Sequence, residues 1–331
     1  MASERICILG TGQMAVTCAT ILSDNHHSVT LLGLPEHVEA LSQRRESPHM
    51  PGIPLPPRAQ VTADCQVLAG ASLIVCALPT QVLAPNFAAY RASGLVLSGP
   101  VVSCAKGIEL DTMRRPSQII TAVGGVDAVA VLSGPNIAAE VVRRKPAGAV
   151  VACEDSRIAE RVRAAFATDY FRVYTNRDVI GVELAGALKN VIALAAGIID
   201  GLGLGNNAKA SLITRGIVEI TRLGASLGAS PETFYGLAGL GDLITTCVSP
   251  DGRNRTVGEA VGRGHRLEAV LAELGSVCEG VPTARAVRDL ARRQGVEMPI
   301  VDAVNAVLFD GKDVRAAIVE LMTRGPKSES C

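Results

Sequence analysis

The sequence predicts an α/β protein in which an N-terminal parallel-sheet domain, residues 1–178, is followed by an all-helical C-terminal domain, residues 179–331. Short apolar runs alternate with helical patterns in the first half, and a glycine-rich turn follows the first run. From Val179 onward the apolar pattern is helical, with glycine breaks and no alternating runs. A chain of 331 residues is long enough for two domains of this kind.

The first apolar run and its turn indicate a Rossmann-type dinucleotide-binding unit. Arg5–Leu9 is typical of a strand, and it ends at Gly10-Thr11-Gly12-Gln13-Met14-Ala15, which opens a helix-compatible segment. Val29–Leu32 closes a βαβ unit of suitable length. In that fold Gly10 makes the tight turn, Gly12 lets the backbone approach a pyrophosphate, and the position of Ala15 packs helix on strand.

The segment after the second strand leaves the choice between NAD and NADP open. An acid there binds the ribose hydroxyls of NAD, whereas a basic group binds the 2′-phosphate of NADP. Gly33–His37 gives neither signal clearly, because leucine and proline precede the glutamate and the histidine.

Further apolar runs are expected to extend the sheet. They are Leu73–Ala77, Val96-Leu97 with Val101–Cys104, Ala128–Leu132, Ala149–Ala152 and Phe171–Tyr174. Ligands of open α/β sheets bind just beyond the carboxyl ends of the strands. Lys106 follows one such run and is either an anion-binding group or a loop lysine in water. Gly134–Ala138 follows another, where free N–H groups at a helix start suit a ligand oxygen.

A primary amine stands inside the apolar helical segment Gly181–Gly197. On a helix of 3.6 residues per turn, Lys189 shares its face with small residues such as Ala185 and Gly186. Burial among methyl groups lowers the pKa of a lysine and suits it to proton transfer near neutral pH. The alternative is a lysine whose stem covers apolar surface while its ammonium group stays in water.

The second half carries other polar groups in apolar surroundings. Gly201–Asn207 leads into a long helix, Ala208–Leu227, which one of the two asparagines at its start is expected to cap. Asp242 lies between leucines and glycines. Gly252-Arg253-Asn254-Arg255 places two guanidinium groups at a helix start, where they either bind phosphate or stay exposed. The apolar helix face of Ile300–Leu308 could pair two copies of the chain.

Composition argues against several classes of function. Lysine plus arginine and aspartate plus glutamate both number 32, so no net field attracts nucleic acid or an anionic membrane. Without tryptophan and with 3% aromatic residues, stacking platforms for single-stranded nucleic acid are not expected. The nine cysteines contain no CxxC pair and are interpreted as free thiols that bind no metal. With no leader segment and no apolar run of ~18 residues, a cytoplasmic protein without a membrane span is expected.

In order along the chain, these segments resemble the NAD(P)-dependent glycerol-3-phosphate dehydrogenases. The matching motifs are Gly10–Ala15, Pro51–Pro56, Ala105–Glu109, Ser133–Ala138, Lys189-Asn190, Leu212–Gly216, Ala238–Leu243, Arg253–Arg255 and Glu279-Gly280. The resemblance implies a reductase that transfers hydride from NADH or NADPH to dihydroxyacetone phosphate, reversibly giving sn-glycerol 3-phosphate for glycerophospholipid synthesis. The cofactor is NAD or NADP, the substrate is a small phosphorylated three-carbon molecule, and a homodimer is expected.

The resemblance also implies residue roles. Lys189 matches the catalytic proton donor, and Asp242 is expected to orient its amine. The positions matched to substrate are Lys106, Gly134, Asn136, Lys189, Asp242, Gly252, Arg253 and Asn254. Those matched to cofactor are Gly10, Gly12, Gln13, Met14, Ala15, Lys106, Ala138, Arg253, Val277 and Glu279. No metal site is implied.

Several positions depart from the pattern of that family. The family usually has an aromatic residue at Met14, a third glycine at Ala15 and a basic or polar residue at Leu34. A Gly99-Pro100 turn also interrupts the run before Lys106, and hydroxyl side chains are common in the family at Asn136 and Gly252. Two alternatives therefore stand beside the first interpretation. One is a related two-domain dehydrogenase that acts on another small hydroxy acid, phosphate or phosphonate. The other is a nucleotide sensor without catalysis, although a sensor has no need of a proton donor such as Lys189.

Overall fold

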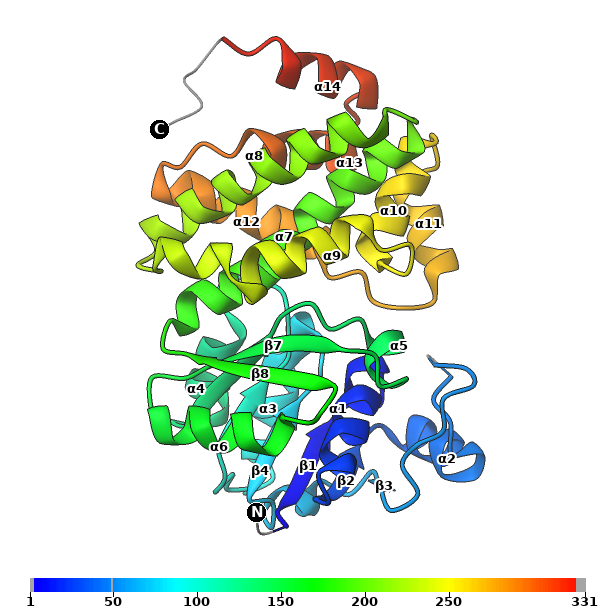
Figure 1. Cartoon of the computed structure of the whole chain (residues 1–331), viewed down its shortest axis with the longest axis vertical. Coiled ribbons are helices and arrows are strands. Elements are labelled where there is room, and N and C mark those ends of the chain that lie inside the picture. Colours follow the sequence, from blue (N-terminus) through cyan, green and yellow to red (C-terminus); the bar gives the residue numbers. More distant parts are fainter. Residues whose placement is uncertain (1–2, 49, 326–331) are drawn as a thin grey trace.

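The computed structural model describes residues 3–48 and 50–325, and the chain forms an elongated molecule with two unlike halves (Figure 1). A sheet flanked by helices occupies the half that contains the N-terminus, and helices occupy the other half. The last strand ends at Asn176, and the long helix α7 begins at Val179. The predicted fold class, α/β followed by an all-helical part, is therefore confirmed.

A single sheet in the order β3-β2-β1-β4-β5-β6-β7-β8 forms the centre of the first half. Its strands are β1 (Arg5–Leu9), β2 (Ser28–Leu32), β3 (Gln60–Thr62), β4 (Leu73–Cys76), β5 (Val101–Ser103), β6 (Val129–Ser133), β7 (Ala147–Ala152) and β8 (Phe171–Asn176). Neighbouring strands are parallel except β6 and β7. Leu9 pairs with Leu32 and Cys76, and Cys76 pairs with Ser103. The turns after these strands and after β6 therefore meet at one edge.

The sheet differs from the sequence-based expectation in three places. β3 escaped prediction because Gln60–Thr62 is short and has no apolar run. Val96 and Leu97 lie outside β5, because the turn at Gly99 separates them from it and leaves no room for a side chain against Ser72. The antiparallel step between β6 and β7 turns the last two strands around, so Ala152 and Asn176 lie at the opposite edge of the sheet.

Both faces of the sheet are covered by apolar packing. Along β1, Ile6 and Ile8 belong to the core on one face, whereas Cys7 and Leu9 belong to the core on the other. The covering helices are α1 (Gln13–Asp24), α2 (Pro35–Arg44), α3 (Leu83–Ala92), α4 (Pro116–Gly124), α5 (Ala138–Val141) and α6 (Ser156–Phe166). Burial on both faces explains why these strands have continuous apolar runs and not alternating patterns.

Helix α7 (Val179–Gly201) is the centre of the second half, and its residues 181–199 are all buried. Around it lie α8 (Gly205–Ser226), α9 (Asp242–Val248), α10 (Arg253–Gly262), α11 (Leu267–Leu274), α12 (Gly280–Gln294), α13 (Pro299–Phe309) and α14 (Val314–Met322). By length and composition alone α7 could cross a membrane, contrary to the expectation that no segment qualifies. Its most apolar window is wholly buried inside the protein, as in a core helix.

Two expectations for the helical half are wrong. Helix α8 already begins at Gly205, so Asn206 and Asn207 lie in its first turn, and no side chain caps it. Within the Ile300–Leu308 segment of α13, the apolar face is buried against the other helices of its own chain. That face is therefore not available for pairing with a second copy.

Glycines bring α7 and α10 into backbone contact. A side chain at Gly197 would lie 2.0 Å from the Arg255 carbonyl oxygen, and one at Gly258 would lie 2.0 Å from the Leu194 carbonyl oxygen. Real β-carbons do not approach backbone atoms this closely, so only glycine fits at either position. The close crossing fixes the start of α10 relative to the middle of α7.

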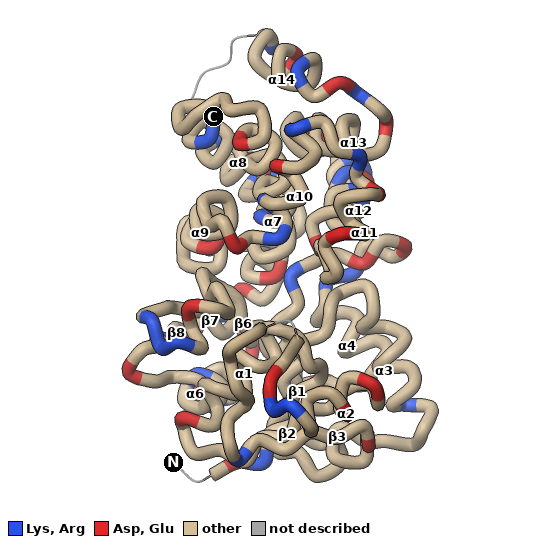
Figure 2. Tube along the Cα trace, turned by 90° about the vertical axis from the view of Figure 1, so that its right-hand side faces the viewer, with Lys and Arg blue, Asp and Glu red and all other residues tan. Residues whose placement is uncertain are grey.

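Charged residues of both signs are spread over both halves of the molecule (Figure 2). This distribution accompanies a formal net charge of zero. The charges that matter for function are the few that lie between the two halves.

Candidate active site

Lys189 and Asp242 form the centre of the candidate site. Lys189 extends from α7 and is 6% exposed, and its Nζ donates to Oδ1 of Asp242 at 2.7 Å. Asp242 begins α9, directly after the π-helical turn Leu237–Gly241. Nζ of Lys106 donates to the other carboxylate oxygen, Oδ2, at 2.8 Å. One buried carboxylate therefore bridges two ammonium groups that come from different halves of the chain.

Lys106 is an anchored residue and not a loop lysine in water. It follows β5, and its ammonium group also donates to the Gly134 carbonyl oxygen and to Oδ1 of Asn136, each at 3.0 Å. Both acceptors lie in the turn after β6. With Asp242, these contacts use all three N–H groups of the lysine.

Burial and neighbouring charges act on the pKa values of this cluster. Burial and the nearby Lys106 ammonium group lower the pKa of Lys189, Asp242 opposes the shift, and the net pKa is about 8. Burial alone raises the pKa of Asp242, but the two ammonium groups of Lys106 and Lys189 outweigh it and hold that pKa below its usual value. The carboxylate is thus ionised near neutral pH, and the Lys189 amine can exchange its proton there.

Two residues that sequence reasoning gave no role complete the cluster. Thr246 lies one turn after Asp242 on α9, and its hydroxyl accepts a hydrogen bond from Nζ of Lys189. Asn190 donates from Nδ2 to the Lys106 carbonyl oxygen at 2.8 Å. A signal for Thr246 exists in the sequence, because residues four apart share a helix face. A signal for Asn190 is its place next to Lys189, on the neighbouring face of the helix.

The start of α10 brings Arg253 and Asn254 to the same region. The Asn254 amide donates to Oδ1 of Asn190 at 2.9 Å, and its oxygen accepts from the Gly280 N–H at 2.9 Å. Asn254 therefore joins α10 to α7 and α12. Arg253 is exposed, and its Nη1 donates to the Val277 carbonyl oxygen at 3.0 Å. Other N–H groups of its guanidinium can therefore bind a ligand.

Arg255 does not form a phosphate fork with Arg253. Its guanidinium lies in an ion-pair network with Asp200 at 2.7 Å and Glu259 at 3.0 Å, at the crossing of α7 and α10. It is neither an exposed cap nor a ligand-binding group. The spacing in the sequence could not reveal this, because Asp200 is far away along the chain.

Glu279 lies between the two halves of the molecule. Its carboxylate accepts from the backbone N–H of Thr80 at 2.7 Å and from the Thr80 hydroxyl at 3.0 Å. Burial raises the pKa of Glu279, against the hydrogen bonds from Thr80 and the nearby Arg253. Val277, two residues earlier, is about half exposed.

The turn after β1 has the properties that a pyrophosphate requires. Gly10 has φ +112°, which favours glycine. A side chain at Gly12 would meet no protein atom within 4 Å, and the N-cap Gly12 has no side chain to cover the start of α1, as a phosphate at a helix start requires. Ala15, by contrast, is buried and packs the helix on the sheet, so its side chain does not line the turn. Gln13 and Met14 lie between these positions on the first turn of α1.

A second feature fits a bound cofactor at this edge. The buried hydroxyl of Ser133, at the end of β6, has no hydrogen-bond partner among the described residues. It lies against Gly186 of α7, where the stem of Lys106 also packs. Ala138, which starts α5, follows the same turn. The residues present therefore fit a dinucleotide whose reactive end lies near Lys106 and Lys189.

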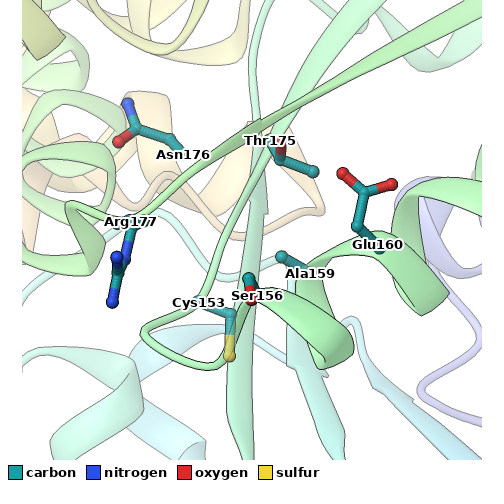
Figure 3. Close-up of a pocket in the computed structure, with 7 residues that line it drawn as sticks. All are labelled: Cys153, Ser156, Ala159, Glu160, Thr175, Asn176 and Arg177. Atoms are coloured by element: carbon teal, nitrogen blue, oxygen red, sulfur yellow. The ribbon is translucent and has the colours of Figure 1, made fainter.

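The surface hollow drawn in Figure 3 is a separate place. It lies where β7 and β8 end, at the sheet edge opposite the Lys106 turn. Its lining residues are Cys153, Ser156, Ala159, Glu160, Thr175, Asn176 and Arg177. None of the predicted site residues belongs to it.

The cysteines of the described part of the chain are free thiols, and most are buried. Burial raises the pKa of Cys7 to about 12, and the pKa of Cys247 shifts in the same way to the same value. Such thiols are poor nucleophiles and poor metal ligands. Among the described residues no cluster of three or more histidine, cysteine, aspartate or glutamate side chains could hold a metal ion.

Comparisons with known proteins agree with this geometry. A family profile described as "NAD-dependent glycerol-3-phosphate dehydrogenase N-terminus" matches residues 5–159, and its C-terminal counterpart matches residues 178–319. Proteins named glycerol-3-phosphate dehydrogenase [NAD(P)+] from Streptomyces griseus subsp. griseus and Citrifermentans bemidjiense are 47% and 44% identical. The alignments cover 98% of both chains for the first protein and 99% of both chains for the second.

Solved structures extend the likeness. The crystal structure of glycerol-3-phosphate dehydrogenase from Coxiella burnetii has a TM-score of 0.93 and 32% identity, and covers 97% of this chain and 99% of its own. A D-mandelate dehydrogenase at 14% identity and a TM-score of 0.62 shares the fold alone. The match over both halves and the full-length relatives identify the chain as a member of the NAD-dependent glycerol-3-phosphate dehydrogenase family.

Proposed function

We propose that the protein catalyses the reversible, NAD(P)H-dependent reduction of dihydroxyacetone phosphate to sn-glycerol 3-phosphate, which feeds glycerophospholipid synthesis. The observation that carries this proposal is the buried pair of Lys189 and Asp242, joined by Lys106 from the sheet half. It lies at the sheet edge where dinucleotide cofactors bind. Family membership supports the identity of the substrate.

The proton chemistry follows from Lys189. When bound, the reduced nicotinamide supplies hydride to the carbonyl carbon. The carbonyl oxygen then gains alkoxide character and needs a proton, which the Lys189 ammonium donates; in the oxidative direction the neutral amine accepts it. Asp242 and Thr246 orient the amine by accepting two of its N–H groups.

The substrate phosphate is bound at the start of α10. The exposed guanidinium of Arg253 offers N–H donors, and Gly252, at the N-cap, leaves backbone N–H groups without a side-chain acceptor. Asn254 holds this helix start against Asn190. Lys106, with Gly134 and Asn136, forms the opposite wall, next to the carbonyl end of the substrate.

Residues along the carboxyl edge of the sheet would hold the cofactor. Gly10, Gly12, Gln13 and Met14 would hold its pyrophosphate through the start of α1, and Ala15 would contribute by its backbone and by packing that helix. Lys106 and Ala138, with Arg253, Val277 and Glu279 from the helical half, would hold the rest of it. The cofactor is NAD or NADP, and Leu34, the exposed and uncharged N-cap residue of α2, indicates neither of the two.

The two halves divide these tasks. We assign residues 1–178 to cofactor binding and residues 179–331 to substrate binding and proton transfer. A cytoplasmic location is part of the proposal. Burial of α7 inside the protein fits a core helix and not a membrane span. The homodimer stays a prediction, which sedimentation equilibrium tests directly.

The decisive test is an assay with purified protein. Dihydroxyacetone phosphate is added with NADH or with NADPH, and loss of the reduced nicotinamide absorbance is followed. We expect oxidation with at least one cofactor. Turnover with a 2-oxo acid and not with dihydroxyacetone phosphate would assign the protein to the related dehydrogenases, and calorimetric cofactor binding without any turnover would make it a sensor.

A further inference from the structure

Glu183 is a buried carboxylate that takes no part in the proposed proton chemistry. It lies on α7 and is 2% exposed. Its carboxylate accepts from the backbone N–H of Ser117 at 2.7 Å, from the Ser117 hydroxyl at 2.6 Å, and from Nη1 of Arg115. These donors belong to the start of α4 in the sheet half. The contact therefore crosses from one half of the molecule to the other.

The segment that Glu183 holds is the far end of the loop that carries Lys106. The near end is held by Asn190, which donates to the Lys106 carbonyl oxygen at 2.8 Å. Glu183 and Asn190 are seven residues apart on α7, about two helical turns, and so lie on the same face. Helix α7 thus carries Lys189 and also holds both ends of the loop between Lys106 and Ser117 by hydrogen bonds.

The loop between these two contacts is braced by Gln81, which lies outside it in the turn after β4, and by an ion pair within it. The side chain of Gln81 donates to the Ile108 carbonyl oxygen at 2.8 Å and accepts from the Leu110 N–H at 3.1 Å. Glu109 accepts from the guanidinium of Arg114 at 3.0 Å. A displacement at the start of α4 is therefore passed along the loop to Lys106 instead of being absorbed within it.

A buried carboxylate of this kind is not an efficient way to stabilise a fold. Burial raises the pKa of Glu183, although Arg115 and Ser117 oppose the shift. Desolvation offsets much of the attraction within a buried ion pair, so the pair adds little to the free energy of unfolding. In some proteins such a pair instead specifies how two segments are placed against each other. Here the arrangement specified is the distance between the Lys106 loop and α7.

We propose that Glu183 is a positioning residue that keeps the Lys106 ammonium group within hydrogen-bond distance of Asp242. It thereby determines which charged groups act on the proton donor Lys189. The proposal rests on the function assigned above. Asp242 accepts from both lysines, so moving Lys106 away leaves the carboxylate to Lys189 alone. Two effects follow: Lys189 holds its proton more tightly, and substrate loses one wall of its site.

The direction of the pH effect can be stated. Lys106 lowers the pKa of Lys189, and Asp242 raises it. Loosening Lys106 removes the first effect and strengthens the second, so the pKa of Lys189 increases from about 8. The loss of reductive activity at high pH then moves to higher pH.

The test compares Glu183→Gln with a matched control. The amide can still accept from the Ser117 N–H, but it faces Arg115 with an NH₂ group, so the contact between α7 and the start of α4 is weakened. Glu219→Gln is the control, because Glu219 is also buried and accepts from a helix start, the Ile300 N–H at 2.9 and 3.1 Å, within the helical half. Ser117→Ala, which removes only one donor, is a milder second variant in case Glu183→Gln folds poorly.

For Glu183→Gln we expect the KM for dihydroxyacetone phosphate to increase about tenfold, since small misplacements of positioning groups weaken catalysis strongly. The high-pH limit of reduction should shift upward by roughly half a pH unit. Ser117→Ala should shift both quantities less and in the same direction. Glu219→Gln should change neither.

A readout that does not depend on turnover separates this proposal from the proposed function. The chain contains six lysines, so the side-chain NMR signal of Lys189 can be assigned in isotope-labelled protein. Its titration should move to higher pH in Glu183→Gln, whatever substrate the enzyme uses. An unchanged titration in both Glu183→Gln and Ser117→Ala, or an equal shift in Glu219→Gln, would overturn the positioning role. Absence of turnover with wild-type protein would overturn only the proposed function.

Discussion

Lys189 is subject to two opposing effects on one ammonium group. Burial favours the neutral amine, whereas the carboxylate of Asp242 favours the charged form. The balance leaves the pKa of Lys189 at about 8, so both protonation states are accessible near neutral pH. A donor of this kind serves both directions of a reversible reduction.

Replacing Lys189 by methionine should remove turnover and leave cofactor binding nearly unchanged. Methionine fills the apolar space but carries no proton, and loss of a positioned acid lowers the rate by about 10²- to 10⁴-fold. Steady-state kinetics measure the loss, and calorimetry measures cofactor affinity. Lys209→Met is the matched control, because Lys209 pairs with Asp200 away from the cluster. A near-normal rate in Lys189→Met would place the proton donor elsewhere.

The pH dependence should have opposite signs in the two directions. Reduction needs the Lys189 ammonium, so its kcat/KM should fall as pH rises through about 8. Oxidation needs the neutral amine, so its kcat/KM should rise over the same range. Profiles measured in both directions with one buffer series check this expectation. Two profiles that fall together would contradict it.

Arg253→Ala should act on the phosphate of the substrate. The exposed guanidinium offers donors that alanine lacks, and we expect the KM for dihydroxyacetone phosphate to rise about tenfold or more. Dihydroxyacetone, which has no phosphate, provides the control substrate: with saturating cofactor, its slow reduction should be unaffected. An equal loss with both substrates would mean that Arg253 acts through the cofactor or the fold and not through the phosphate of the substrate.

Single residues of the site could be recognised from the sequence, but their partners could not. Lys189 and Asp242 each attracted attention as a charge in an apolar run. Their hydrogen bond spans 53 positions, so only the folded chain determines it. The role of Arg255 could not be predicted for the same reason, because its partner Asp200 lies on a different helix.

At the scale of the element, the crossing of α7 and α10 fixes the geometry of the site. Gly197 and Gly258 allow backbone contact, and α10 carries Arg253 at its start. The glycines therefore act on substrate binding without touching substrate.

Gly258→Ala should destabilise the protein and weaken substrate binding together. Its β-carbon would lie 2.0 Å from the Leu194 carbonyl oxygen, so the two helices must move apart. Overpacking of this kind costs about 1–3 kcal/mol or more, and α10 moves with Arg253. Thermal unfolding and the substrate KM measure the two effects. Thr256→Ala, at an exposed position of the same helix, should change both only slightly.

Elements with strong apolar patterns were predictable, and those defined by pairing were not. β1, α1 and β2 follow from the first glycine turn and its flanking runs. β3 has no apolar run, and it is a strand only because β2 offers it hydrogen bonds. The antiparallel direction of β7 depends on its neighbour β6, and no local pattern encodes strand direction.

At the scale of the whole molecule, the site exists only where the two halves meet. Lys106 and Asn136 come from the sheet half, and Lys189 and Asp242 come from the helical half. An apolar cluster that includes Val131 of β6 and Val182 of α7 also joins the halves. The contacts that build the site therefore also couple the halves in stability.

Because the apolar cluster and the Lys106–Asp242 contact join the two halves, we expect urea to unfold both in a single transition. Tyr90, Tyr170 and Tyr174 lie in the sheet half, so tyrosine fluorescence reports mainly on that half. Far-UV circular dichroism reports mainly on the helices of the other half. The two probes should give the same midpoint, and separate midpoints would show that the halves unfold independently.

The composition of α7 has a consequence for synthesis of the chain. The helix leaves the ribosome before α8 and α10, which later cover it, so a segment apolar enough for a membrane is exposed for a time. A charged residue at the centre of a membrane-inserted helix costs about 2.5–3.5 kcal/mol on insertion scales. Lys189 lies at the centre of this helix, and Glu183 lies nearer its start. The lysine that serves the active site therefore also discourages the nascent helix from entering a lipid bilayer.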